Sequence, residues 1–234
     1  MKKMKLLTGI MVILLTIFGI VVSNLDDEGK RAEDELNMVR RKYAERFGNG
    51  PLPELVHDEL LTSIARTFSP ECEKWTHGPN YRFTMTSGDP LASRLLATDV
   101  SVAILSAGYE QLPISDEEKN QYAVVNDAMD DISQKYSIVG MELLNPAQTN
   151  IGCANTRCTG KVTDEFKVVF NTTKETYTYA SVCLFGPKNQ WAPGELKKYR
   201  KMAFETVKDV QNLKMVVDSN RRFVQWFNGA MLKE

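Results

Sequence analysis

The sequence holds few of the residues and motifs on which common enzyme sites depend. Its only histidines are His57 and His77. It has no His-Glu-x-x-His segment and no Gly-x-Ser-x-Gly segment, which excludes the usual helix-borne zinc protease site and the serine hydrolase elbow. Glycine-rich phosphate loops and the dinucleotide fingerprint are missing too. The sequence therefore favours a binding or structural role over catalysis.

An excess of basic residues is also lacking. The chain has 29 Lys and Arg against 30 Asp and Glu, a net charge of −1. Nucleic-acid surfaces need clustered positive charge, so we expect no nucleic-acid partner. The 234 residues can still bury a sizeable core in one domain.

The N-terminus has the pattern of a secretion signal. Three lysines precede an apolar run of 17 residues, Leu6 to Val22. A membrane-spanning helix takes about 20 predominantly apolar residues, whereas a basic start, a short apolar core and a small residue at the exit are typical of a signal peptide. We predict that residues 1–23 are removed and that the rest is secreted, extracellular and without a membrane span. The alternative is an uncleaved anchor.

Cysteine usage agrees with secretion. The four cysteines are Cys72, Cys153, Cys158 and Cys183. An even number in a secreted chain predicts disulfides, and four cysteines allow three pairings. Since the chain has no Cys-x-x-Cys pair and only two histidines, a zinc site is the weaker reading.

One acceptor for an N-linked glycan is present at Asn171-Thr172-Thr173. In a secreted chain we expect Asn171 to be glycosylated.

Helical periodicity prevails in the first part of the chain. Apolar residues at spacings of three and four predict helices over 26–47, around 60–68, over 91–106 and from Ser115 onwards. Ser115 and Glu118 fit a capping box at the start of the last of these. Residues 72–90 contain scattered Gly, Pro, Ser and Asn and are expected to form a loop.

Strand patterns come later. Residues 167–171 and 176–185 are rich in Val, Thr, Tyr and Phe and resemble a hairpin. After Pro193-Gly194, apolar residues from Tyr199 to Val217 predict one long helix. The bases and aromatics of 221–227 suit either an interface with a membrane or partner, or packing onto the domain. Helices followed by strands indicate an α+β domain with a helical tail.

Several segments, in their order, resemble the CAP superfamily (SCP/TAPS proteins), which includes cysteine-rich secretory proteins, venom allergens and pathogenesis-related proteins. The resemblance covers about Glu33 to Asn189. The segments that carry it are Asn37-Met38-Val39-Arg40-Arg41, Pro53 to Leu60, Cys72 with His77, Asn145 to Asn150, Ile151-Gly152-Cys153-Ala154 with Cys158, and Val182-Cys183-Leu184-Phe185-Gly186-Pro187-Lys188-Asn189.

The resemblance implies a fold and a disulfide pairing. It implies an α-β-α sandwich with a central antiparallel sheet, here over 26–192, followed by a helical extension over 193–234. It also implies that Cys153 pairs with Cys183 and that Cys72 pairs with Cys158.

Family members often carry two histidines and two glutamates around a cleft that can bind zinc. Only His77 matches one of them. The segments that resemble the other positions, 80–83, 101–105 and 137–142, lack the expected histidine and glutamates. One histidine cannot supply three or four zinc ligands, so we predict a degenerate cleft with no metal, no cofactor and no catalytic residue.

The resulting hypothesis is a secreted, non-catalytic CAP-like protein that binds an unidentified extracellular protein, lipid or sterol. One alternative is a secreted hydrolase with an unrecognised site. Another is a structural protein held in the membrane by Leu6 to Val22.

Overall fold

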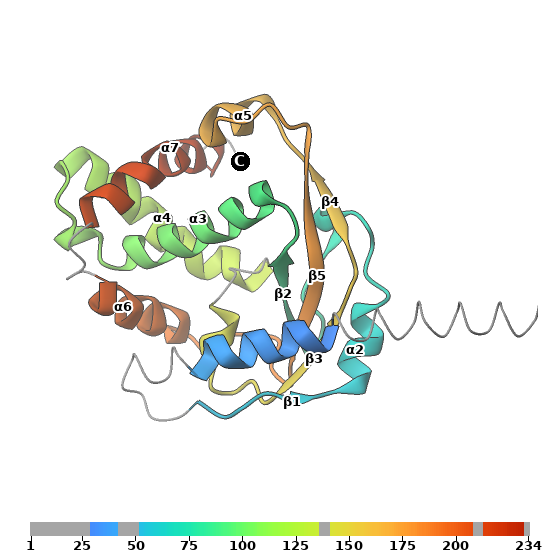
Figure 1. Cartoon of the computed structure of the whole chain (residues 1–234). Coiled ribbons are helices and arrows are strands. Elements are labelled where there is room, and N and C mark those ends of the chain that lie inside the picture. Colours follow the sequence, from blue (N-terminus) through green and yellow to red (C-terminus); the bar gives the residue numbers. More distant parts are fainter. Residues whose placement is uncertain (1–28, 42–51, 136–140, 208–212, 232–234) are drawn as a thin grey trace, which may run out of the picture.

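A computed structural model describes residues 29–41, 52–135, 141–207 and 213–231 (Figure 1). The predicted signal peptide lies outside these residues. Residues 29–41 are helical, and the predicted ends of that helix, at 26 and 47, are not described. The other elements are β1 (Val56–His57), α2 (Glu59–Ala65), η1 (Cys72–Lys74), β2 (Arg82–Ser87), α3 (Pro90–Ala107), η2 (Tyr109–Gln111), α4 (Asp116–Lys135), η3 (Glu142–Leu144), β3 (Asn150–Ala154), β4 (Cys158–Lys161), α5 (Asp164–Phe170), β5 (Thr176–Gly186), α6 (Glu195–Val207) and α7 (Leu213–Met231).

The fold is α+β, with one mixed sheet organised around β5. The strand order is β1-β3-β5-β2, and β4 also pairs with β5. β2, β3 and β4 run antiparallel to β5, but β1 runs parallel to β3. The resemblance implied a central antiparallel sheet, and that expectation is wrong for the parallel pair of β1 and β3 at this edge. The reason is that β1 joins β3 through the short stretch Val56–His57 rather than through a hairpin.

Helices cover both faces of this sheet, as side-chain alternation along β5 requires. Val182 and Leu184 pack with residues of α2 and α3. Cys183 and Phe185 point to the opposite face and pack with the helix of residues 29–41. In Figure 1 that helix lies in front of the sheet, with α2 at the right.

The C-terminal helices share the largest core with α3 and α4. Leu196, Phe204 and Val217 are buried in that cluster. From segment 221–227, Phe223 is buried in the same cluster, and its ring centroid is 5.4 Å from that of Trp226. The sequence left two interpretations of this segment, an interface with a membrane or partner and packing onto the domain. In the structure the segment packs onto the domain. α3 is long and apolar enough to span a membrane, but in the described part of the chain it is a partly buried core helix.

Two local predictions are wrong. Residues 167–171 form the end of α5 rather than a strand. The Thr163 hydroxyl caps α5 by accepting from the Phe166 N–H, and Phe166 and Phe170 lie one turn apart on its buried face. This local cap and the i, i+4 pair outweigh the strand preference of Val168 and Val169.

The segment expected to be a loop contains β2. Arg82, Phe83 and Thr84 are all buried there, and β2 pairs with β5 from Arg82–Phe185 onward. Burial on both faces removes the polar–apolar alternation by which an exposed strand is identified.

The last two differences concern helices. The predicted long C-terminal helix is two helices, α6 and α7, with the intervening 208–212 outside the described residues. The apolar residues that predicted the helix around 60–68 do not all face the core in α2. Leu60 is 70% exposed, whereas Leu61, Thr62 and Ala65 are buried.

Candidate functional site

The four cysteines form two disulfides, and each closes a separate part of the sheet. Cys153 on β3 and Cys183 on β5 are directly opposite one another and are joined. Cys72 of η1 is joined to Cys158 at the start of β4. This is the pairing that the resemblance implied, and it ties the loop before β2 to the sheet.

His77 supports β2. Its Nδ1 accepts a hydrogen bond from the Phe83 N–H at 3.1 Å, and the two ring centroids are 4.8 Å apart. Across the residues that the structure describes, no cluster of three or more His, Cys, Asp or Glu side chains is arranged to hold a metal ion. The predicted loss of the metal cleft stays a prediction, and His77 has a structural contact that accounts for its position.

Two segments that resemble parts of the family's cleft do meet, through an ion pair. Arg82 Nε donates to Glu142 Oε2 at 2.6 Å, with the two side chains 0% and 1% exposed. Arg82 also donates to the carbonyls of Asn189 and Ser133. Burial raises the pKa of Glu142, and the hydrogen bond and charge of Arg82 oppose that rise. The two buried side chains pair with each other here, so neither is open to bind a ligand.

Arg40, in the segment Asn37-Met38-Val39-Arg40-Arg41, holds several distant parts of the chain together by hydrogen bonds. Its buried guanidinium donates to the carbonyls of Pro53, Leu143, Asn145 and Gln148. Burial lowers its pKa to about 10. These bonds tie the helix of residues 29–41 to the chain that enters β1 and β3.

A groove lies where the same helix meets β1 and α2, and it is the best candidate for a binding site. Its volume is about 880 Å³, within the roughly 300–1,000 Å³ usual for ligand sites. The residues that line this charged groove are Lys30, Glu33, Asp34, Asn37, Glu54, Leu55, His57, Glu59, Thr62, Arg66 and Cys153.

The centre of the charged groove is a histidine held between carboxylates. His57 Nδ1 lies 2.9 Å from Glu33 Oε2, and His57 Nε2 lies 3.3 Å from Glu59 Oε2. The Glu33 side chain is 8% exposed and also accepts from the Cys153 N–H at 3.0 Å. The hydrogen bond with Glu33 is the main cause that raises the pKa of His57, and burial opposes it.

The histidine at this position was visible in the sequence, but its partner was not. Glu33 precedes His57 by 24 residues and comes from another element. No spacing rule joins them, because the helix of residues 29–41 and β1 come into contact only once the chain has folded. The chain has only two histidines, and they lie in different parts of the fold. His57 lines the charged groove, and His77 contacts β2.

Asn171, the predicted glycan acceptor, lies on the surface. It ends α5 in the left-handed conformation (φ 46°), and both Asn171 and Thr173 are exposed. Asparagine tolerates this conformation better than most residues. The geometry is compatible with the predicted glycan and does not test it.

The chain was compared with family models, curated proteins and solved structures. No family model matches it. No curated protein and no solved structure matches it either. The likeness to the CAP superfamily therefore depends on the sequence segments quoted above.

Proposed function

We propose that the chain is a secreted, non-catalytic CAP-like protein that binds an extracellular protein through the charged groove. The observation that carries the proposal is the lining of that groove. Four carboxylates, Glu33, Asp34, Glu54 and Glu59, face it with the basic side chains of Lys30 and Arg66.

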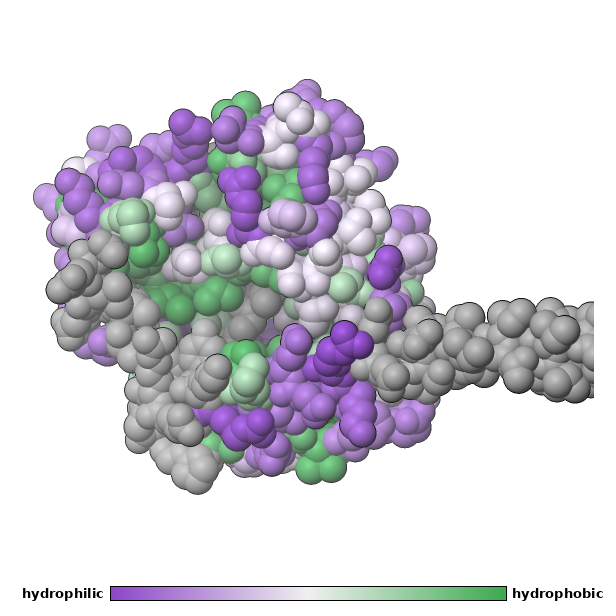
Figure 2. Space-filling view, in the orientation of Figure 1, coloured by the Kyte–Doolittle hydropathy of each residue, from purple (hydrophilic) through white to green (hydrophobic). Residues whose placement is uncertain are grey.

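This lining favours a protein segment over a lipid or sterol. A lipid site is predominantly apolar, whereas Leu55 is the one large aliphatic side chain of the charged groove. The outer surface of the helix of residues 29–41 is mostly hydrophilic, with a smaller hydrophobic patch (Figure 2). Glu54 and Glu59 already pair with Arg41 and Arg66, but their exposed carboxylates can accept further contacts. Such carboxylates attract lysine and arginine side chains, so the ligand we propose is a basic segment of a partner protein.

The same residues support a binding role rather than hydrolysis. The Thr62 hydroxyl donates to the Asp58 carbonyl at 3.1 Å, which occupies the proton that a base would have to remove. Glu33 is held by the Cys153 N–H and by His57. The two disulfides agree with an oxidising compartment, as secretion requires.

The test screens a library of displayed peptides for binding to the secreted, glycosylated protein. All peptides have the same length and differ in net charge. We expect basic peptides to bind with an affinity that falls as salt rises, because charge attraction is screened. The double variant Glu54→Gln/Glu59→Gln should weaken binding about tenfold, since each lost exposed ion contact contributes about 0.7 kcal/mol and about 1.4 kcal/mol is a factor of ten. Both residues are exposed, at 65% and 69% of their side chains, so the fold should tolerate the change.

The matched control is Glu117→Gln/Asp131→Asn on α4, which removes two exposed charges far from this lining. Binding that both double variants weaken equally would contradict the assignment to the charged groove. Peptides should be recovered intact by mass spectrometry, and cleaved products would favour the hydrolase. A lipid retained by the purified protein, with no peptide binding, would overturn the choice of a protein ligand.

A further inference from the structure

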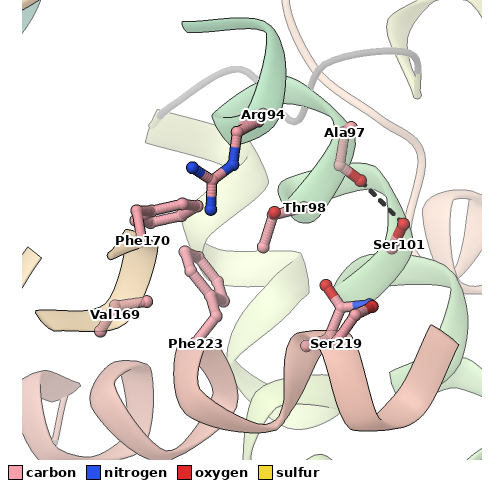
Figure 3. Close-up of a pocket in the computed structure, with 9 residues that line it drawn as sticks. Arg94, Ala97, Thr98, Ser101, Val169, Phe170, Ser219 and Phe223 are labelled. Carbon is pink, nitrogen blue, oxygen red and sulfur yellow. Dashed lines mark hydrogen bonds between the residues drawn. The ribbon is translucent and has the colours of Figure 1, made fainter. Parts of the chain in front are cut away.

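A second, smaller pocket lies between α3, α5 and α7. Its volume is about 260 Å³, and Figure 3 shows the residues around it. They are Arg94, Ala97, Thr98, Ser101, Val169, Phe170, Ser219, Asn220 and Phe223. The α7 residues of this lining follow Asn189, whereas those of α3 and α5 lie within the range that the resemblance covers. The pocket shares no residue with the charged groove.

One end of the pocket is cationic. The guanidinium of Arg94 lies 5.6 Å from the centroid of the Phe170 ring. Within the described part of the chain Arg94 makes no ion pair, and the Thr98 hydroxyl makes no hydrogen bond. The two side chains leave α3 one turn apart and lie on the same side of it (Figure 3). A guanidinium and a free hydroxyl side by side suit a carboxylate.

One wall is aromatic. Phe170 and Phe223 are 4% and 7% exposed, and their ring centroids are 6.0 Å apart at 72°. The rings come from α5 and α7 and contact one another edge to face, so together they form one wall of the pocket (Figure 3). The volume is below the roughly 300–1,000 Å³ typical of sites for drug-sized ligands, so it suits a ligand about the size of one aromatic ring.

The other end offers acceptors. The Ser219 hydroxyl donates to the Val216 carbonyl at 2.7 Å, and the Asn220 amide nitrogen donates to the same carbonyl at 2.7 Å. Ser101 donates to the Ala97 carbonyl at 2.8 Å. The two serine hydroxyl protons are engaged, so their oxygens present lone pairs to a ligand, and the Asn220 amide oxygen is a further acceptor. They therefore match a ligand group that carries an N–H or O–H.

We propose that this pocket binds a small aromatic carboxylate whose ring also carries a hydrogen-bond donor. The carboxylate lies against Arg94 and Thr98. The ring packs against the edge-to-face pair of Phe170 and Phe223, and the donor faces Ser219 and Asn220. The inference is independent of the function proposed for the charged groove.

The test is calorimetric titration of the full secreted chain with 4-hydroxyphenylacetate. The matched probes are its neutral amide and phenylacetate, which lacks the ring hydroxyl. We expect saturable binding of 4-hydroxyphenylacetate, binding at least about tenfold weaker for the amide, and a smaller loss for phenylacetate, because hydrogen bonds to charged groups contribute more than neutral ones.

Three variants locate the site. Arg94→Gln should weaken binding by about tenfold or more, and Thr98→Val, which keeps the side-chain shape, by a few fold. Arg222→Gln, an exposed arginine on α7 outside this lining, should leave it unchanged. Circular dichroism would verify that each variant is folded. Absence of saturable binding to the wild-type chain, equal binding of acid and amide, or binding that survives Arg94→Gln would each overturn the proposal.

Discussion

Arg82 and Glu142 form an ion pair that is closed to solvent on every side and joins β2 to η3. The N–O distance is 2.6 Å, and the two residues are 60 positions apart in sequence. The pair joins two segments that are distant in sequence and leaves neither charge open to solvent.

Removing one charge of this pair should be costly. In Glu142→Gln the amide can still contact Arg82, but the buried guanidinium loses its counter-ion, and we expect the free energy of unfolding to fall by about 3–5 kcal/mol. Urea denaturation would measure the loss. Glu54→Gln is the control, because its exposed partner Arg41 lies 2.5 Å away in solvent and the pair should contribute about 0–1 kcal/mol.

The double variant Arg82→Met/Glu142→Leu should recover part of that loss by removing both charges. Recovery should be incomplete, because the carbonyls of Ser133 and Asn189 lose their donor. Equal stability of Glu142→Gln and wild type would contradict the importance assigned to the pair.

His57 should titrate above its ordinary pKa of 6.5, because Glu33 stabilises its charged form. The sign for stability follows from the raised value in the folded state. The contribution is fully present below pH 6.5 and is lost as pH rises through the pKa of the folded protein. Since the His57 side chain is 54% exposed, we expect less than about 1 kcal/mol.

An NMR titration of the His57 ring would measure this pKa. Glu33→Gln should return it toward 6.5, because the amide keeps a hydrogen-bond acceptor for the Cys153 N–H but has no charge. Asp34→Asn, an exposed neighbour on the same helix, is the control and should change it less. An unchanged pKa in Glu33→Gln would show that the pair does not control His57.

Asp99 on α3 should make the protein less stable as the pH rises. Burial raises its pKa from 3.8 to about 7. Between these values the folded state holds a proton that the unfolded chain has released, so the free energy of unfolding falls as pH rises through this window.

Asp99→Asn removes the ionisable group and should raise the free energy of unfolding at pH 8 by up to about 4 kcal/mol, the value that corresponds to a pKa shift from 3.8 to about 7. The difference from wild type should disappear near pH 4. Thermal or urea denaturation at both pH values provides the measurement. Asp131→Asn, on the exposed face of α4, should change stability by less than about 0.5 kcal/mol at either pH. A pH-independent effect of Asp99→Asn would exclude titration as its cause.

Glycosylation at Asn171 can be tested without changing that residue. Thr173→Ala removes the acceptor triplet but keeps Asn171 in its left-handed conformation at the end of α5. We expect the secreted variant to migrate faster in gels, and glycosidase treatment should bring wild type to the same position. Thr172→Ala keeps the triplet and is the control. Identical migration of untreated wild type and Thr173→Ala would mean that the site is unused.

The sequence alone determined the elements whose signals are local. The Ser115–Glu118 capping box at the start of α4 is present in the structure, with the Glu118 N–H bonded to the Ser115 hydroxyl at 3.3 Å. α3 and β5 also lie where periodicity and β-branched residues predicted them. These signals act within a few residues, so no knowledge of distant contacts is needed to read them.

Tertiary structure decided what depends on contacts between distant segments. β2 is a strand because β5 supplies its hydrogen bonds and both of its faces are covered, and neither fact is encoded within residues 82–87. The same holds for the sites. Glu33 reaches His57, and Arg94 shares a pocket with Phe223, only after helices far apart in sequence have packed together. Burial and charge at these places are properties of the assembled core.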